Sequence, residues 1–303
     1  MKYTILLYLF SILLFACSRE SPSHDKLKSI EILNTINSEE IDLLNALSNQ
    51  EINAFKIRPN HDILFSLGTL VHEANHKFHD IDNPTQINYR LNNNYHLKFK
   101  RHEVFGSKEL IRSMPSTHIE NFKDNHRYKL YIADTEGIEN MSTQSNGLYG
   151  LLDEYNSYYQ DMKTIVGLYT YIKEYYKCTD SEILVNYLGL YDDVMNSMSE
   201  FRYFTRAYIS HAKNNQPKIY ENIKNNQDLE EMLKYLKREE NSLLRQYAVI
   251  QGEILENCKN YLEISNNAIS VPGTDIGYRI NQRANRSEMY DKLISELKTR
   301  DNK

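Results

Sequence analysis

Two histidines and a glutamate lie within five residues of one another, in the segment His72-Glu73-Ala74-Asn75-His76. Residues four apart in an α-helix lie one turn above each other on the same face, so in a helix His72 and His76 can bind one metal ion. Glu73 lies beside the first histidine, where it can act as a general base on a metal-activated water molecule. The order H-E-x-x-H is typical of catalytic zinc sites. It therefore predicts zinc as the cofactor, His72 and His76 as metal ligands, and Glu73 as a catalytic residue.

The residues around this motif predict a buried helix. Apolar side chains recur there at helical spacing, namely Leu64, Leu67, Val71, Ala74 and Phe78, with Phe65 and Leu70 widening the apolar face. The segment 58–60 breaks the chain before the helix, and the segment 80–84 ends it with asparagine and proline. Histidines and a glutamate on such a helix are costly to desolvate unless they are paired or bind a metal. This favours a metal site over two ordinary histidines.

A hydrolytic zinc site needs a third protein ligand and one open position. The leading candidate is Glu154, in a segment that begins with two glycines and continues as a helix rich in apolar and aromatic residues. Tyr158 shares a helical face with Glu154, so Tyr158 is a candidate catalytic residue that could stabilise an oxyanion. Asp153 or Asn156 could instead orient a ligand histidine through its other ring nitrogen.

The motif helix, the strand-rich segment after it and a later helix that carries a glutamate resemble the zincin metallopeptidases, in the gluzincin arrangement. The resemblance covers residues 60–165, and only the five-residue motif is specific. It implies a zincin-like core, zinc held by His72, His76 and Glu154, and hydrolysis of a peptide bond in a peptide or protein substrate with Glu73 as the base.

Three alternatives stay open. The spacing of the metzincins would make Asp82 the third ligand, although His79 occupies the position where that pattern has a glycine. One of the histidines of the strand-rich segment, or Tyr159, could stabilise an oxyanion in place of Tyr158; these histidines are His96, His102, His118 and His126. The chain could also be a non-enzymatic helical surface lipoprotein, such as an adhesin, a binding module or an envelope-assembly factor.

The N-terminus predicts export. Lys2 is followed by an apolar stretch, residues 5–15, which is too short to span a bilayer comfortably and has the length of a signal-peptide core. The run Leu14-Phe15-Ala16-Cys17 resembles the lipobox of bacterial lipoproteins. This implies a signal peptide at 1–16, lipidation of Cys17 and a tether at 17–25. The expected location is the bacterial cell envelope, anchored to a membrane, with the outer membrane or cell surface favoured over the inner membrane.

Composition and hydrophobic periodicity predict a mainly helical α+β fold. The net charge is −5 without a basic stripe, which excludes nucleic acid as an expected partner. The few prolines and glycines, 6 and 10, favour long helices. Cys178 and Cys258 could pair in an oxidising compartment, which the sequence leaves open.

Periodicity also sets the expected elements. We expect helices within 26–56, strands at 95–100 and 128–133, and helices from about 148, including 228–267 and 284–299. The zincin-like core would span 26–165, and a helical C-terminal region would span 166–303.

Overall fold

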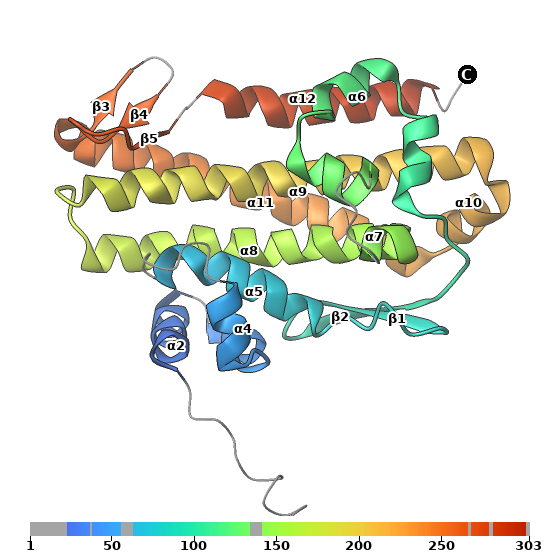
Figure 1. Cartoon of the computed structure of the whole chain (residues 1–303), viewed down its shortest axis with the longest axis horizontal. Helices are drawn as coiled ribbons and strands as arrows, with labels where there is room; N and C mark the ends of the chain where they lie inside the picture. The colour runs from blue at the N-terminus through green and yellow to red at the C-terminus, as the bar shows by residue number, and fades with distance from the viewer. Residues whose placement is uncertain are drawn as a thin grey trace, which may run out of the picture.

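Three long helices form the body of the molecule: α8 (Leu148–Tyr175), α9 (Ser181–Asn215) and α11 (Gln227–Cys258). The computed structural model describes residues 23–36, 38–55, 63–133, 141–265, 268–278 and 281–300, with only the backbone at 38, 281–287 and 300. The predicted signal peptide and Cys17 lie outside these residues. Figure 1 shows α8 between the N-terminal helices and α9, with α12 (Asn281–Arg300) packed along α9. The predicted mainly helical α+β class is confirmed.

Shorter elements complete the described chain. The helical ones are α2 (His24–Ile36), η1 (Ser38–Glu40), α3 (Ile41–Asn45), α4 (Asn49–Ala54), η2 (Ile63–Ser66), α5 (Leu67–His76), η3 (Ser107–Arg112), α6 (Ser116–Phe122), η4 (Tyr128–Ala133), α7 (Ser142–Ser145), α10 (Pro217–Lys224) and η5 (Lys259–Tyr261). The strands are β1 (Gln86–Asn92), β2 (Tyr95–Lys100), β3 (Glu263–Ile264), β4 (Ile269–Ser270) and β5 (Gly277–Tyr278).

The motif helix α5 is buried, as its periodicity predicts. Leu67, Leu70, Val71 and Ala74 are fully buried, and Phe78, just past the helix end, is 39 % exposed. The helix packs against α8, which is itself buried along most of its length because α5, α9 and α11 all contact it. This central position explains why apolar residues occur around most of the circumference of α8.

The hairpin β1–β2 confirms the strand predicted at 95–100. The two strands are antiparallel, with Tyr89 opposite Leu97 and Ile87 opposite Phe99. In β2, Leu97 and Phe99 point into the core while His96, Lys98 and Lys100 are exposed, so the alternation predicts its buried face correctly. The small sheet of β3, β4 and β5 was not predicted.

The strand predicted at 128–133 is wrong, because this segment forms the π-helical turn η4. Asn125 precedes it and satisfies its first amides: the side-chain oxygen of Asn125 accepts from the backbone N–H groups of Arg127 and Tyr128, and its carbonyl accepts from Lys129. An asparagine that bonds nearby backbone favours a helical start over an extended strand. The alternation in the sequence also fits a turn with Tyr128 and Ile132 buried.

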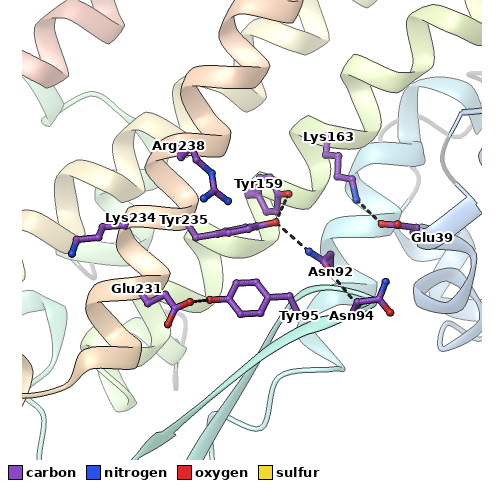
Figure 2. A pocket seen from close by; sticks show the side chains of 10 residues that line it. All are labelled: Glu39, Asn92, Asn94, Tyr95, Tyr159, Lys163, Glu231, Lys234, Tyr235 and Arg238. Carbon is purple, nitrogen blue, oxygen red and sulfur yellow. Dashed lines mark hydrogen bonds and ion pairs between the residues drawn. The ribbon is translucent and has the colours of Figure 1, made fainter.

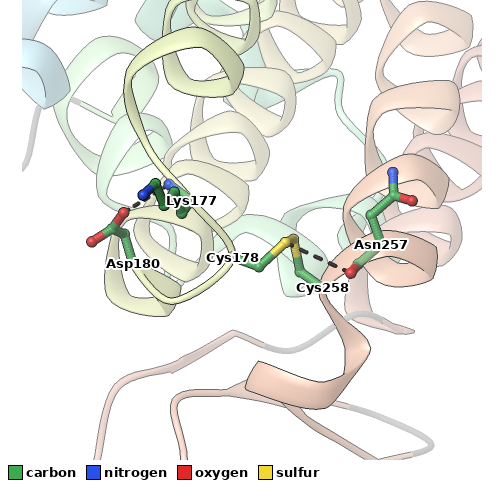
Figure 3. Close-up of a disulfide and its surroundings, with 5 residues drawn as sticks. All are labelled: Lys177, Cys178, Asp180, Asn257 and Cys258. Atoms are coloured by element: carbon green, nitrogen blue, oxygen red, sulfur yellow. Dashed lines mark hydrogen bonds between the residues drawn. A yellow bond between two sulfur atoms is a disulfide. The ribbon is translucent and has the colours of Figure 1, made fainter.

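A disulfide joins Cys178, in the turn between α8 and α9, to Cys258 at the end of α11, with 5.0 Å between the Cα atoms (Figure 3). Helix α8 runs unbroken through residue 165, where the sequence suggested a division, and one hydrophobic core includes residues on both sides of that position. Within the described residues, no helix is both long and apolar enough to cross a membrane.

Candidate metal centre

The candidate centre lies where α5 and α8 pack in opposite directions. His76 contacts Asp153 near the start of α8, and His72, one turn earlier in α5, contacts Glu154 and Tyr158. One turn earlier again, Gly68 faces Asp161: a Cβ on Gly68 would lie 1.9 Å from the Asp161 Oδ1 atom. The absence of a side chain at Gly68 therefore allows the close approach that brings the histidines onto α8.

Gly147 fixes where α8 begins. Its φ of 54° lies in the left-handed region that glycine adopts readily, and a Cβ there would lie 2.2 Å from the backbone oxygen of Phe105. The chain enters α8 through this tight position, so that the carboxylates at 153 and 154 lie in its second turn.

Three side chains converge as the sequence predicts. The Nε2 atoms of His72 and His76 are 3.1 Å apart, and the Oε2 atom of Glu154 lies 3.6 Å from the first and 4.0 Å from the second. A tetrahedral ion with ligand bonds of about 2.0–2.2 Å separates its ligand atoms by about 3.3–3.6 Å. The observed separations bracket that range, so these residues fit a zinc ion.

The carboxylate of Glu154 is poorly satisfied by the protein alone. Glu154 is 6 % exposed, and within the described residues its buried Oε2 atom has no hydrogen-bond partner. A buried carboxylate oxygen without a hydrogen bond is costly. A cation between this oxygen and the two imidazoles would remove that cost.

Asp153 orients His76 through the ring nitrogen that faces away from the cluster. Its Oδ2 atom lies 2.8 Å from Nδ1 of His76, leaving Nε2 of His76 to face His72 and Glu154. Burial by itself lowers the pKa of His76, but the carboxylates of Asp153 and Glu154 outweigh it and raise that pKa to about 10. Asp153 thus has the orienting role that the sequence left open between it and Asn156.

His79 supports Asp153 in turn. Its Nδ1 bonds to Asp153, and its Nε2 lies 2.9 Å from the amide nitrogen of Asn156 and 3.2 Å from that of Asn75. The Asn156 amide also donates to the carbonyl of Arg90, which fixes its orientation. Because an amide nitrogen only donates, Nε2 of His79 accepts and its proton is on Nδ1. His79 therefore buttresses Asp153 and does not face the three-residue cluster.

The two predicted catalytic residues lie beside the cluster. Glu73 is half-buried, and no described residue forms a hydrogen bond or an ion pair with it. The Tyr158 ring packs edge-on against the His72 ring, with 4.4 Å between centroids. Burial, followed by the charge of Glu154, raises the pKa of Tyr158, so its hydroxyl keeps its proton at neutral pH.

Sequence reasoning missed two side chains here, Asp161 and Tyr131. Burial, with Asp193 and Glu73 nearby, raises the pKa of Asp161 well above its usual range. Burial and the charges of Glu154 and Glu73 likewise raise the pKa of Tyr131. The spacing of Asp161, seven residues after Glu154 on α8, could have placed it on the same face. No helical spacing pointed to Tyr131, because the pattern of its segment predicts a strand.

The remaining candidates lie elsewhere. Asp82, the alternative third ligand, accepts a hydrogen bond from Asn146 and is absent from the cluster of possible metal ligands. His96 is exposed near the hairpin turn, and His118 bonds to Tyr203 and Glu296. Tyr159 faces away from the cluster, and its hydroxyl lies 3.1 Å from that of Tyr235.

A cleft of about 810 Å³ lies between the hairpin, α8 and α11 (Figure 2). Tyr95, Tyr159 and Tyr235 meet there, and their hydroxyls bond to one another or to neighbours such as Glu231. Its lining contains no member of the metal cluster, and the hydrogen bonds of its tyrosines are already made within the protein. The cleft is therefore separate from the candidate centre.

Comparison with known proteins adds no assignment. No family model matches the chain, and no curated protein or solved structure shows significant similarity to it.

Proposed function

We propose that this protein binds one zinc ion through His72, His76 and Glu154 and hydrolyses peptide bonds. The observation that supports this most is the convergence of the two Nε2 atoms on a buried carboxylate oxygen that has no hydrogen-bond partner within the described residues, all within 4.8 Å. The H-E-x-x-H order then gives Glu73 a defined task. A helix pair held together for stability alone would have no need for this costly group of polar atoms.

When bound, the zinc ion lowers the pKa of water and polarises a carbonyl group. Glu73 takes a proton from the attacking water and later returns it to the leaving amine. Its carboxylate suits this because no ion pair within the described residues holds it. Tyr158 donates its hydroxyl proton in a hydrogen bond to the oxyanion that develops on the substrate carbonyl. The hydrogen bond to Asp153 keeps the His76 ring in the same orientation during these steps.

The proposed setting is the bacterial cell envelope, with the chain anchored by lipid on Cys17. The disulfide between Cys178 and Cys258 supports export, because disulfides persist in oxidising compartments and are rare in the cytosol. A zincin-like core on a lipid tether would act on peptides or proteins at the membrane surface.

The decisive variant is Glu73→Gln. We expect the purified variant to retain one zinc equivalent by elemental analysis while its cleavage of a labelled protein substrate falls by at least about 10²-fold, because the proton transfers are lost. Cleavage at the normal rate would refute the role of Glu73.

Metal content tests the site itself. The double variant His72→Ala and His76→Ala should lose the zinc, whereas His96→Ala, which alters an exposed histidine outside the cluster, should keep it. A wild-type protein that binds no zinc at any concentration would instead favour the non-enzymatic surface lipoprotein.

A further inference from the structure

A second polar cavity, of about 210 Å³, lies on another side of α8, between α9, α11 and α12. Tyr155 contributes to its wall, so it begins one residue from the proposed ligand Glu154. The volume is below the roughly 300–1,000 Å³ typical of drug-sized ligands, which suits a small group.

Cationic side chains dominate the lining. Four of them, Arg202, Arg206, Lys237 and Lys298, line the cavity together with the single carboxylate of Asp291. They come from three helices, so the cluster is a product of the tertiary fold. The lining is therefore positive.

Arg202 is only partly satisfied by the protein. It is 6 % exposed, its Nε atom pairs with Glu240 at 2.9 Å, and its Nη1 atom pairs with Asp291 at 2.6 Å. Its Nη2 atom is buried and has no hydrogen-bond partner within the described residues. A buried N–H donor of this kind costs free energy unless a ligand or water accepts from it.

Arg206 lies one helical turn further along α9. It is half-buried, and no carboxylate or carbonyl in the described part of the chain pairs with it. Burial, together with the neighbouring Arg202 charge, lowers the pKa of the Arg206 guanidinium below its usual range. Lys237 shares its nearest carboxylates with Arg202, at 3.7 Å from Asp291 and 3.9 Å from Glu240. The cavity therefore has more cationic donors than the protein satisfies.

We propose that this cavity binds a phosphoryl group, held by Arg206 and the buried Nη2 donor of Arg202 and flanked by Lys237 and Lys298. Arginine forks match phosphate oxygens in geometry as well as in charge, and the lysines add point charges at the rim. A dianion would neutralise the excess positive charge and accept hydrogen bonds from the donors that lack partners within the described residues. The proposal does not depend on zinc binding or on peptidase activity.

Calorimetric titration of the purified protein with inorganic phosphate, at constant ionic strength, tests the site. We expect saturable binding of one phosphate and a rise of the melting temperature with phosphate. Arg206→Met should weaken binding by about tenfold or more, because a charge-assisted hydrogen bond is lost. Without phosphate this variant should melt at or above the wild-type temperature, because it removes a half-buried cation that is costly to desolvate and is repelled by Arg202.

Two further variants separate a site from general charge effects. Lys298→Met removes an exposed rim cation and should weaken phosphate binding, whereas Arg238→Met removes a cation from the cleft of Figure 2 and should leave it unchanged. Non-saturating heats, or equal affinities in the Arg206→Met and wild-type proteins, would overturn the proposal.

The phosphoryl group could come from a soluble ester or from a lipid headgroup. A water-soluble short-chain phosphatidic acid that binds at least about tenfold more tightly than phosphate, and loses this affinity in Arg206→Met, would identify a lipid headgroup. Affinity no greater than that of phosphate would identify a soluble phosphate ester.

Discussion

At the scale of single residues, the two proposed histidine ligands have different support. His76 is held at Nδ1 by Asp153, which is itself held by His79. His72 has a buried Nδ1 atom with no hydrogen-bond partner within the described residues, and its ring is fixed by contact with Tyr158. Orientation of His72 therefore depends on packing, whereas His76 is oriented by the carboxylate of Asp153, with the hydroxyl of Ser157 at 3.4 Å from the same Nδ1 atom.

Asp153→Asn should lower zinc affinity by about 10–100-fold, because loss of an outer-shell partner releases the ring of His76. Competition with a chelating dye would measure this. Asp82→Asn makes the same chemical change at the alternative ligand, which bonds only to Asn146 in the described structure, and should leave zinc affinity unaltered. The reverse pattern, with zinc lost from Asp82→Asn alone, would reassign the third ligand.

Spacing explains what could be predicted at this scale. His72 and His76 follow from the helical period alone, and Glu154 follows from a carboxylate at the start of a second apolar helix. Asp161 could not be recognised as a buried acid with a raised pKa, since its environment depends on Gly68 and Asp193 in other helices. Tyr131 was not identified as a site residue, because alternation of apolar residues over six positions fits a strand and a helical turn equally well.

At the scale of elements, the contact of α5 with α8 decides whether the site exists. Gly68→Ala would place a methyl group against Asp161 and within 3.1 Å of the Ile165 side chain. We expect it to lower the free energy of unfolding by about 1–3 kcal/mol and to weaken zinc binding, because the helices must separate. Denaturant titration and dye competition would measure the two effects.

A matched substitution separates this clash from the helical preference for alanine. Gly252 lies within α11, and apart from the adjacent part of its own helix no described atom lies within 4 Å of the position that an added methyl group would take, so Gly252→Ala should stabilise by about 0.5–1 kcal/mol. Adding Asp161→Ala to Gly68→Ala should restore zinc binding by making room. Equal stabilities of the Gly68→Ala and Gly252→Ala proteins would contradict the close approach.

A second contact ties α4 to the end of the motif helix. Lys77 pairs with Glu51 at 2.6 Å, and Glu51 also forms a capping box with Ser48. These hydrogen bonds lower the pKa of Glu51 from 4.5 to about 2. A carboxyl whose pKa is lower in the folded chain stabilises the fold above pH 4.5, and this contribution is lost as the pH falls toward 2.

Glu51→Gln should therefore reduce the loss of stability between pH 4.5 and 2, measured by thermal unfolding across that range. The side chain is about one-third exposed, so solvent screening limits the expected effect to less than about 1 kcal/mol. Identical pH dependence in the variant and the wild type would show that the pair contributes nothing.

The face that a short helix buries was less predictable than the presence of the helix. The helix expected at the start of residues 26–56 exists as α2, where Leu27 is 55 % exposed and Ile32 is buried, although helical spacing groups Leu27 with the buried Leu33. Several apolar residues in one short helix allow more than one face, and only packing against the neighbouring elements selects among them. The helix expected at 228–267 exists as α11, because its 32 residues repeat the apolar pattern over many turns.

At the scale of the whole molecule, the disulfide links distant parts of the helical body. It joins residues 80 apart in sequence, at the end of α8 opposite to the metal centre. Between Glu154 and the last residue of α8, the helix rises by roughly 30 Å. The disulfide and the candidate metal centre therefore lie at opposite ends of the same three-helix body.

Replacing both Cys178 and Cys258 with serine should lower the free energy of unfolding by about 4–5 kcal/mol, because the unfolded chain regains the freedom of a closed loop of 80 residues. Denaturant titration of the variant against the oxidised wild type measures this, and reduction of the wild type provides a second route to the same state. Zinc stoichiometry should stay unchanged in the folded variant, since α5 and the start of α8 pack together far from the bridge. Loss of zinc together with the bridge, while the protein is still folded, would mean that the position of α8 against α5 depends on the whole helical body.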